Sequence, residues 1–245
     1  MKTDDLPNGP ADLYSRRLIR LWRTLRNHPA WSVSLLGALI AGAIGVFIDL
    51  AEDVRSGARI TLLDQQLAEW LHIHATPGTT RFMLAISVMH NMLPIGIACI
   101  VLALLLYRHG RREWLLGLAL VVPGGTVINT AFKHWMARPR PHFVDPIVTL
   151  TSFSFPSGHT SIATLFYGFV AALLISGSES RVRRWAAIIG ALSMVTLVAA
   201  SRMYLGAHFL TDVLAAFFES VAWLGLCLIG MNVLRRQRRW RRPGT

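Results

Sequence analysis

Long apolar runs recur along the chain and constrain its fold more than any other feature. Six of them approach the roughly 20 residues that an α-helix needs to cross a bilayer. They lie at about residues 32–51, 83–106, 114–132, 160–176, 185–201 and 209–234. Only 16% of the residues are charged, against about a quarter in a typical soluble domain. The sequence therefore predicts an all-α fold, a polytopic membrane helix bundle with six transmembrane helices.

The second run is the least regular, because His90, Asn91 and Pro94 interrupt it. We interpret the interruption as a packing kink, with a functional role as the alternative. No internal repeat, low-complexity tract or long linker divides the chain. We therefore expect a single integral-membrane domain over residues 1–245, with a basic cytoplasmic segment at 1–30 and a basic cytoplasmic tail at 235–245.

A shorter segment, ITLLDQQLAEWLHIH, occupies residues 60–74 between the first two runs. Its apolar residues recur at helical spacing, which predicts a short interfacial helix with Trp70 at headgroup depth. We interpret His72 and His74 as side chains at the wet interface. A metal-binding pair is the alternative, but no carboxylate or thiol cluster joins the two histidines in the sequence.

Positive charge is distributed unevenly along the chain. The net charge is +12, and 18 of the 25 Lys and Arg fall in the N-terminal segment, the connections after the second and fourth runs, and the tail. Six alternating helices place all of these on one side, which the positive-inside rule identifies as the cytoplasm. Both termini are then cytoplasmic, and part of the excess charge contacts anionic lipid headgroups. This distribution favours membrane lipids as partners over nucleic acid.

Only seven cations are left for the outer side, and three of them lie in the segment FKHWMARPRPHF at the end of the third run. Pro139 and Pro141 cannot continue a helix and disfavour helical geometry at the residue before each. Lys133 therefore lies at a helix end, whereas Arg138 and Arg140 lie in an extended turn. Snorkelling or solvated cations are the simpler interpretation of this segment alone.

The fourth run begins in SFSFPSGHTS, residues 152–161. Pro156 suits a turn, Ser157 is a favoured helix N-cap residue, and Gly158 allows close backbone approach. The helix that starts here directs its free N–H groups and the positive end of its dipole outward, which makes an anion site with His159 in the first turn. An ordinary helix cap beside an interfacial histidine is the alternative.

A third polar segment, SRMYLGAHFLTD, lies at residues 201–212 between the fifth and sixth runs. Arg202 follows the fifth helix, and Gly206 marks a turn. His208 and Asp212 are four residues apart and so lie on one face of the sixth helix. A carboxylate one turn from an imidazole can hold one ring N–H and leave the other nitrogen free to react. A structural His–Asp pair is the alternative for this segment alone.

The predicted topology brings all three polar segments to the outer face, at the ends of the third to sixth helices. Together they offer cations, a helix N-terminus, two histidines and an aspartate. Such a set of groups suits the binding of a phosphate dianion.

The three segments also match a known signature in residue type and spacing. Its parts here are Lys133 with Arg140-Pro141 after six residues, Pro156-Ser157-Gly158-His159, and Ser201-Arg202 with His208 after five residues and Asp212 after three more. In this the chain resembles the type-2 phosphatidic acid phosphatase family, which shares the signature with vanadium haloperoxidases and bacterial acid phosphatases. The resemblance covers about residues 80–225, and the six-span layout is similar to the bacterial membrane branch.

The resemblance implies a role for each matching residue. His208 is similar to the family's nucleophile, Asp212 to the residue that orients it, and His159 to the acid–base group. The phosphate-binding residues that it implies are Lys133, Arg140, Ser157, Gly158 and Arg202. The family needs no metal or other cofactor, so none is expected here.

A metal-independent lipid phosphatase is therefore the leading hypothesis. It would hydrolyse undecaprenyl pyrophosphate, phosphatidylglycerophosphate, phosphatidic acid, a lipid A phosphate or a similar lipid through a phosphohistidine intermediate. The short loops resemble those of bacterial members, which implies the inner membrane and a periplasmic active site. No obligate protein partner is evident. The alternatives are a non-enzymatic lipid-phosphate carrier and a haloperoxidase-like enzyme that holds vanadate.

Two residues near these segments do not match the signature. Glu219 is predicted on about the same face of the last helix as Asp212, turned into the bundle toward Thr126 or Asn129, since intramembrane carboxylates usually face a bundle interior. A part in substrate entry is the alternative for Glu219. For Arg138 we expect a headgroup or surface role.

Overall fold

A computed structural model describes residues 29–240, except for the side chains of residues 29–33, 236 and 238–240. Most of the basic segment 1–30, residues 1–28, and the end of the basic tail, residues 241–245, lie outside the described residues. The chain divides into two compact units, residues 1–39 and 40–245. The packing described below is that of the second unit, and the single domain expected from the sequence stays a prediction.

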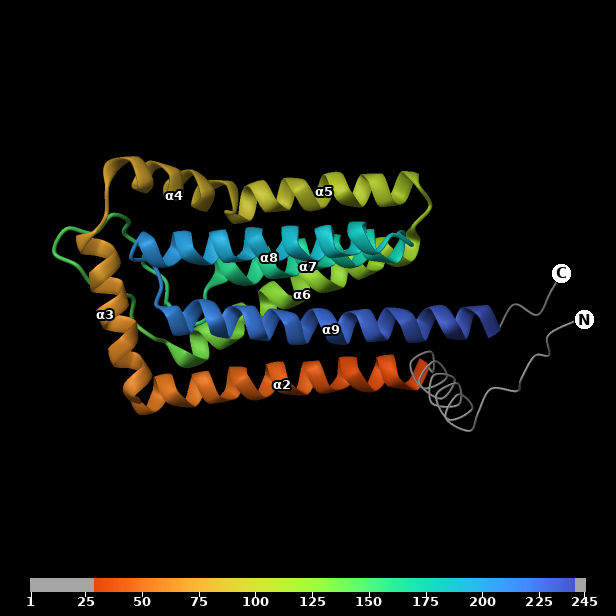
Figure 1. The fold of residues 1–245 in the computed structure, drawn as a ribbon, viewed down its shortest axis with the longest axis horizontal. Coiled ribbons are helices and arrows are strands. Elements are labelled where there is room, and N and C mark those ends of the chain that lie inside the picture. The colour runs from red at the N-terminus through yellow and green to blue at the C-terminus, as the bar shows by residue number, and fades with distance from the viewer. Residues whose placement is uncertain (1–28, 241–245) are drawn as a thin grey trace, which may run out of the picture. The chain divides into compact units, whose positions relative to one another are not determined.

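The described residues form eight α-helices and no strand (Figure 1). The helices are α2 (Pro29–Ser56), α3 (Arg59–Ile73), α4 (Pro77–Met89), α5 (Met92–Arg108), α6 (Arg112–Met136), α7 (Gly158–Ser176), α8 (Arg181–Tyr204) and α9 (Leu210–Trp240).

Five of these helices are long and apolar enough to cross a membrane: α2 from Ser34, α6, α7, α8, and α9 as far as Arg235. Helices α4 and α5 are long enough only together, and they are bent by 48° where they meet. Counting that pair as one broken span gives the six spans that the sequence predicts. The all-α membrane bundle is therefore confirmed.

The break between α4 and α5 lies at His90 and Asn91, where polar residues interrupt the second apolar run. His90 ends α4, Asn91 precedes α5, and Pro94 fits the first turn of α5, where an N–H has no helical partner. The His90 ring lies between two partners, with Nδ1 2.7 Å from the Ile86 carbonyl and Nε2 2.8 Å from the Tyr167 hydroxyl. The kink is therefore packed against α7, as expected, although Asn91 makes a further contact described below.

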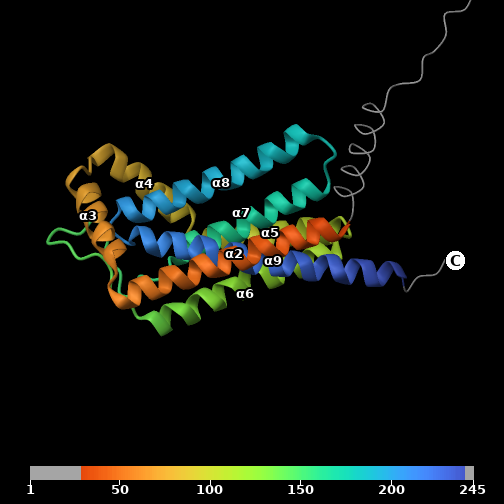
Figure 2. The same ribbon diagram turned by 60° about the horizontal axis from the view of Figure 1, so that its bottom comes forward.

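Helix α3 lies across the ends of α8 and α9 and contacts both (Figures 1 and 2). Leu62, Leu63 and Trp70 are exposed on it, as suits a helix at a membrane interface. Its buried residues are Asp64 and Ala68. The short helix predicted between the first two spans is therefore present, and it also turns a buried carboxylate toward the bundle.

The two histidines of this region have separate aromatic partners. His72 stacks on Phe143 with ring centroids 4.1 Å apart, and His74 stacks on Trp70 at 4.5 Å. Within the part of the chain that the structure describes, no group of three or more His, Cys, Asp or Glu is placed to hold a metal ion.

Helix α7 contacts four other helices, α5, α6, α8 and α9. Glycines let these helices approach closely, as small residues do in membrane bundles. A Cβ on Gly125 of α6 would lie 2.5 Å from a methyl of Leu165, and one on Gly168 of α7 would lie 2.6 Å from a methyl of Leu224. This close packing fixes the start of α7 beside the ends of its neighbours.

Candidate active site

The three polar segments meet at one end of the bundle, where α6 and α8 end and α7 and α9 begin (Figure 1). The backbone N–H of Ser157 donates to the Asp212 carbonyl over 3.0 Å, which joins the starts of α7 and α9. Arg140, in the loop after α6, lies 3.2 Å from His208, measured from Nη1 to Nε2. The structure thus brings the predicted site residues together, while their catalytic roles stay predictions.

His208 and Asp212 are both buried, but only Asp212 lies in α9. His208 precedes the helix by two residues, so the shared helical face predicted for the pair is wrong, and the turn that leads into α9 brings the two side chains together. The His208 Nδ1 lies 3.6 Å from the Asp212 Oδ2, which is an ion-pair distance but too long for a direct hydrogen bond. The other ring nitrogen accepts from Arg140, so we assign the proton of the neutral ring to Nδ1, on the Asp212 side. This tautomer turns the Nε2 lone pair toward the cations of the site.

The His208 imidazole is held in its neutral form. Burial lowers its pKa to about 4, against the opposing effect of the Asp212 carboxylate and with a further lowering by Arg140 and Arg202. At neutral pH the ring is therefore available as a nucleophile without prior loss of a proton.

Three cations, Lys133, Arg140 and Arg202, lie within electrostatic range of this pair. Among the side chains that the structure describes, no carboxylate forms an ion pair with any of the three. Neutral carbonyls and hydroxyls hold them instead. Their positive charge is therefore left for an anion.

Lys133 and Arg140 are fixed by the loop that joins α6 to α7. The Lys133 Nζ donates to the carbonyls of Phe153 and Pro156 over 3.0 and 2.7 Å. The Arg140 guanidinium donates to the carbonyl and hydroxyl of Ser152 over 2.6 and 2.9 Å. Burial lowers the pKa of Arg140, and the charge of Asp212 opposes that shift. The loop thus orients both cations while leaving their charge uncompensated.

The break between α4 and α5 supplies two contacts that sequence reasoning missed. The buried Arg202 guanidinium donates to the hydroxyl of Ser87, near the end of α4. The His159 Nε2 lies 2.6 Å from the Asn91 Oδ1, at the start of α5. The kink therefore positions a cation and a histidine of the site, so a packing role alone does not describe it. The polar pair inside an apolar run was a signal for Asn91, whereas nothing in the sequence distinguished Ser87.

The N-terminus of α7 is capped by Ser157, as predicted. Its hydroxyl accepts from the backbone N–H and the hydroxyl of Thr160 over 3.5 and 3.1 Å. A Cβ on Gly158 would meet nothing closer than the Asn129 Oδ1 at 3.8 Å. No neighbouring group requires glycine at that position. Its backbone N–H is one of the first four of α7, which have no partner within the helix.

The role expected for Arg138 is wrong. Its side chain is only 10% exposed and pairs with two buried carboxylates, 2.6 Å from the Asp212 Oδ1 and 2.8 Å from the Asp64 Oδ2. The backbone turns at Ala137, whose φ is 46°, directly after α6. That turn directs Arg138 into the molecule rather than toward headgroups or solvent. Asp64 was not anticipated, because its partners are far from it in sequence.

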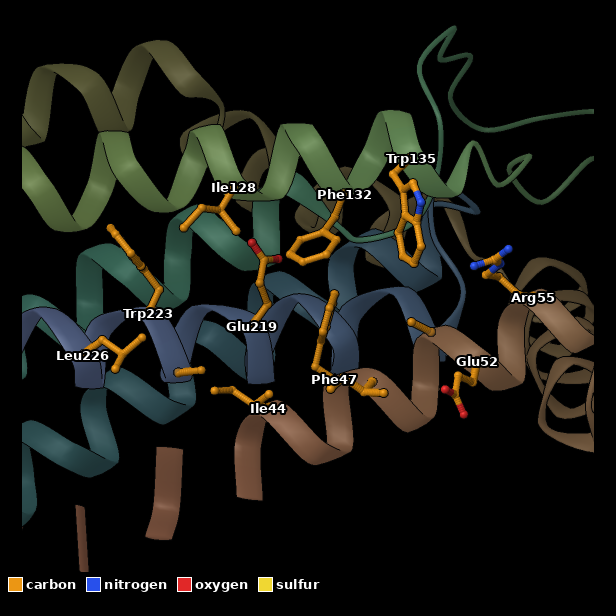
Figure 3. A pocket seen from close by; sticks show the side chains of 13 residues that line it. Ile44, Phe47, Glu52, Arg55, Ile128, Phe132, Trp135, Glu219, Trp223 and Leu226 are labelled. Carbon is orange, nitrogen blue, oxygen red and sulfur yellow. The ribbon is translucent and has the colours of Figure 1, made fainter. Parts of the chain in front are cut away.

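Glu219 is buried in α9 and pairs with Asn129 of α6, whose Nδ2 donates to Oε2 over 3.0 Å. Of the two partners predicted, Asn129 is confirmed. Thr126 is wrong, because its hydroxyl donates to the Val122 carbonyl of its own helix. Glu219 also lines an apolar groove of about 390 Å³ between α2, α6 and α9 (Figure 3).

Fold and site together define an integral membrane protein with a buried histidine–aspartate pair that faces three cations. The family model described as the PAP2 superfamily matches residues 112–236, and the chain belongs to this family.

Two curated relatives bear names that describe an activity. Phosphatidylglycerophosphatase B of Bacillus subtilis is 40% identical over 111 residues, which are 44% of this chain and 53% of the relative. Undecaprenyl-diphosphatase of Sulfolobus acidocaldarius is 35% identical over 121 residues, which are 46% of this chain and 53% of the relative. The chain thus spans about half the length of these curated relatives.

Two solved structures have a similar fold. A transmembrane PAP2 type phosphatidylglycerolphosphate phosphatase from Bacillus subtilis superposes with a TM-score of 0.70 at 28% identity, covering 78% of this chain and 94% of that one. Aquifex aeolicus LpxE superposes with a TM-score of 0.54 at 21% identity, covering 68% and 95%. The second likeness concerns the fold alone.

Proposed function

We propose that this protein is a lipid phosphate phosphatase that passes the phosphoryl group of its substrate to His208 and then to water. The observation that best supports this proposal is the buried His208–Asp212 pair. In this pair the His208 Nε2 is turned toward cations that have no carboxylate partner among the described side chains. Phosphoryl transfer depends mainly on positioning and on stabilising the equatorial oxygens. This arrangement supplies both.

In the first step, the Nε2 lone pair of His208 attacks phosphorus and the bond to the lipid oxygen breaks. Asp212 stabilises the positive charge that develops on the ring. His159 protonates the leaving oxygen, so the lipid alcohol departs and a phosphohistidine forms. With a pyrophosphate substrate, the leaving group is the lipid monophosphate.

In the second step, a water molecule attacks the phosphorus of the phosphohistidine, and His159 takes a proton from that water. The bond between phosphorus and Nε2 then breaks, inorganic phosphate leaves, and His208 is neutral again. Dividing one displacement into two in this way is the advantage of a covalent intermediate.

The proposed phosphate-binding groups are the side chains of Lys133, Arg140, Ser157 and Arg202 and the N–H of Gly158. Each charge-assisted hydrogen bond contributes on the order of 1.5–3 kcal/mol. The helix N-terminus adds directional N–H donors. These groups stabilise the phosphoryl charge themselves, so we expect no metal or other cofactor to be required.

We propose that the substrate is a membrane lipid with a phosphate or pyrophosphate headgroup. One relative is named a phosphatidylglycerophosphatase and another an undecaprenyl-diphosphatase. Two apolar grooves, of about 390 and 500 Å³, suit lipid tails. Phosphatidylglycerophosphate, undecaprenyl pyrophosphate and phosphatidic acid are the candidates to compare.

We also propose a bacterial inner-membrane location, with both termini in the cytoplasm and the site on the periplasmic face. The support is the excess of Lys and Arg in the terminal segments and in the connections at the opposite end of the bundle from the site. No obligate protein partner is included in this proposal.

The test is phosphate release from a panel of these lipids by the full chain, purified in detergent with a chelator present. We expect release from at least one lipid, its loss in His208→Ala, and no loss in His109→Ala, which changes an exposed histidine. Radiolabelled substrate should leave acid-labile label on the protein. Activity that requires added metal, or full activity of His208→Ala, would contradict the mechanism. Binding without turnover would favour a carrier, and vanadate-dependent halide oxidation a haloperoxidase.

A further inference from the structure

Helix α3 contributes one buried carboxylate to the site, that of Asp64, which is only 1% exposed. Arg138 bridges it to Asp212 of α9. The Arg138 Nη2 lies 2.8 Å from the Asp64 Oδ2, and its Nη1 lies 2.6 Å from the Asp212 Oδ1. One guanidinium therefore connects a helix at the bundle end with the carboxylate beside His208.

Asp64 also caps α9 from outside that helix. Its Oδ1 accepts the Thr211 N–H over 3.0 Å, and its Oδ2 accepts the Thr211 hydroxyl over 2.5 Å. The Thr211 N–H is one of the first four of α9, which have no partner within the helix. The position of α3 thus fixes the start of the helix that contains Asp212 and that follows His208.

The Asp212 carboxylate is held at both oxygens. Its Oδ1 accepts from Arg138, and its Oδ2 accepts the backbone N–H of Phe209 over 2.8 Å. Only Oδ2 also faces the His208 Nδ1. Rotation of the carboxylate would break both hydrogen bonds, so these two donors together determine which oxygen His208 meets.

Arg138 also separates two like charges. Asp64 and Asp212 are both buried, and a buried carboxylate without a partner is costly. The Arg138 guanidinium pairs with both and lies over the Phe209 ring at 4.3 Å from its centroid. Because its donors are engaged in this way, Arg138 serves the carboxylates and not the phosphate.

We infer that Asp64 and Arg138 are positioning residues, which hold the Asp212 carboxylate against His208 and balance its charge. This inference rests on the proposed function. Neither residue touches the reacting atoms, and both act through Asp212. Helix α3 then helps to position the site residues and is also an interfacial helix.

The test measures kcat, KM and the pH profile of the full-length protein with Asp64→Asn and Arg138→Gln. We expect kcat to fall about 10- to 100-fold in each, by analogy with the groups that orient the ligands of metal sites. KM should change less than about threefold, because the proposed phosphate cations are untouched. Glu69→Gln, an exposed carboxylate of the same helix, is the matched control.

The pH profile distinguishes positioning from simple stabilisation of the fold. The charged groups that act on His208 are Asp212 from α9, Arg140 from the loop and Arg202 from α8. The titratable ring of His159 from α7 also interacts electrostatically with it. Both variants leave these in place. Removing a negative charge in Asp64→Asn should move the acid limb of kcat/KM to lower pH, and removing a positive charge in Arg138→Gln should move it to higher pH.

Where a single variant fails to fold, Asp64→Asn combined with Arg138→Gln removes one charge of each sign and keeps a hydrogen-bonding pair. Its kcat should stay low while its acid limb lies between those of the single variants. Two outcomes would overturn the inference, provided that Glu69→Gln still releases phosphate. The first is a wild-type kcat in folded variants. The second is a loss of kcat that follows the loss of thermal stability, without opposite shifts of the acid limb in the two single variants. Absence of release from wild type and Glu69→Gln alike would overturn the proposed function and this inference with it.

Discussion

The two nitrogens of the His208 ring have different neighbours, and this asymmetry predicts a pH profile. Burial lowers the pKa of His208 to about 4, below the value near 6.5 of a free histidine. The neutral nucleophile therefore persists as the pH falls through 6 and is lost only near pH 4. The acid limb of kcat/KM should therefore lie near pH 4. An acid limb above about pH 6, measured with chemistry rate-limiting, would contradict a buried neutral His208.

The Asp212 carboxylate should matter for kcat more than for KM. In Asp212→Asn the amide still accepts one hydrogen bond, but it no longer stabilises a positive ring on His208. We expect kcat to fall by about two to four orders of magnitude, as for other carboxylates that orient a catalytic histidine. Steady-state kinetics on the variant checks this, with exposed Asp145→Asn as the control. A variant within about threefold of wild type would mean that Asp212 is structural.

The contact between Asn91 and His159 leads to a prediction about the proton donor. Asn91→Ala removes the oxygen 2.6 Å from the His159 Nε2 and leaves the ring free to rotate. We expect a loss of about 10- to 100-fold in kcat, smaller than the loss in His159→Ala, since general acid–base catalysis as a whole contributes about 10²–10⁴. Asn232→Ala, an exposed asparagine of α9, should be silent. Equal losses in Asn91→Ala and Asn232→Ala would exclude a specific role for the contact.

Arg138 and Arg140 show what the sequence could not predict about individual residues. The two arginines are two residues apart, each is followed by proline, and each is a plausible anion ligand. Only tertiary contacts separate them, because one guanidinium pairs with Asp64 and Asp212 and the other lies against His208. The signature implied phosphate binding for Arg140, which stays a prediction, and the structure places that side chain against His208. No pattern in the sequence could assign Arg138 its two carboxylates.

At the scale of elements, the close crossing of α6 and α7 predicts a stability change. A Cβ on Gly125 would lie 2.5 Å from a methyl of Leu165, so Gly125→Ala overpacks the crossing at a cost of about 1–3 kcal/mol. Thermal unfolding in detergent should detect a lower Tm. Gly190→Ala in α8, where nothing lies within 4 Å of the added Cβ, should leave Tm unchanged or raise it. The reverse order would mean that the helices do not approach as described.

The spans themselves were predictable because crossing a bilayer requires a long apolar run, a property that is local in sequence. The functional contacts of α3, α4 and α5 were not, since they join distant residues. Asp64 and Thr211, for example, are 147 positions apart. The apolar spacing of residues 60–74 predicted the helix. The partners of its buried carboxylate, Asp64, could be identified only from the folded structure. The break at Asn91 could be recognised in the sequence as a polar interruption, but its contact with His159 of α7 could be seen only in the structure.

At the scale of the whole molecule, the proposed topology predicts which loops can be labelled from outside the cell. Helix α7 has 19 residues and is about 28 Å long at 1.5 Å per residue, so the connections at its two ends lie on opposite faces of the membrane. Val144 is fully exposed in the loop that contains Arg140, and Glu179 is exposed in the turn after α7.

In a background that retains phosphate release with both Cys99 and Cys227 replaced by alanine, a membrane-impermeant maleimide should label Val144→Cys in intact spheroplasts. Glu179→Cys should react only after permeabilisation, because the proposed topology puts the Arg-rich turns on the cytoplasmic side. The opposite pattern would keep the site intact but put it in the cytoplasm. If both positions were labelled from one side, α7 could not be a membrane span. The ends of α6 and α8 and the starts of α7 and α9 could then not meet at one membrane face.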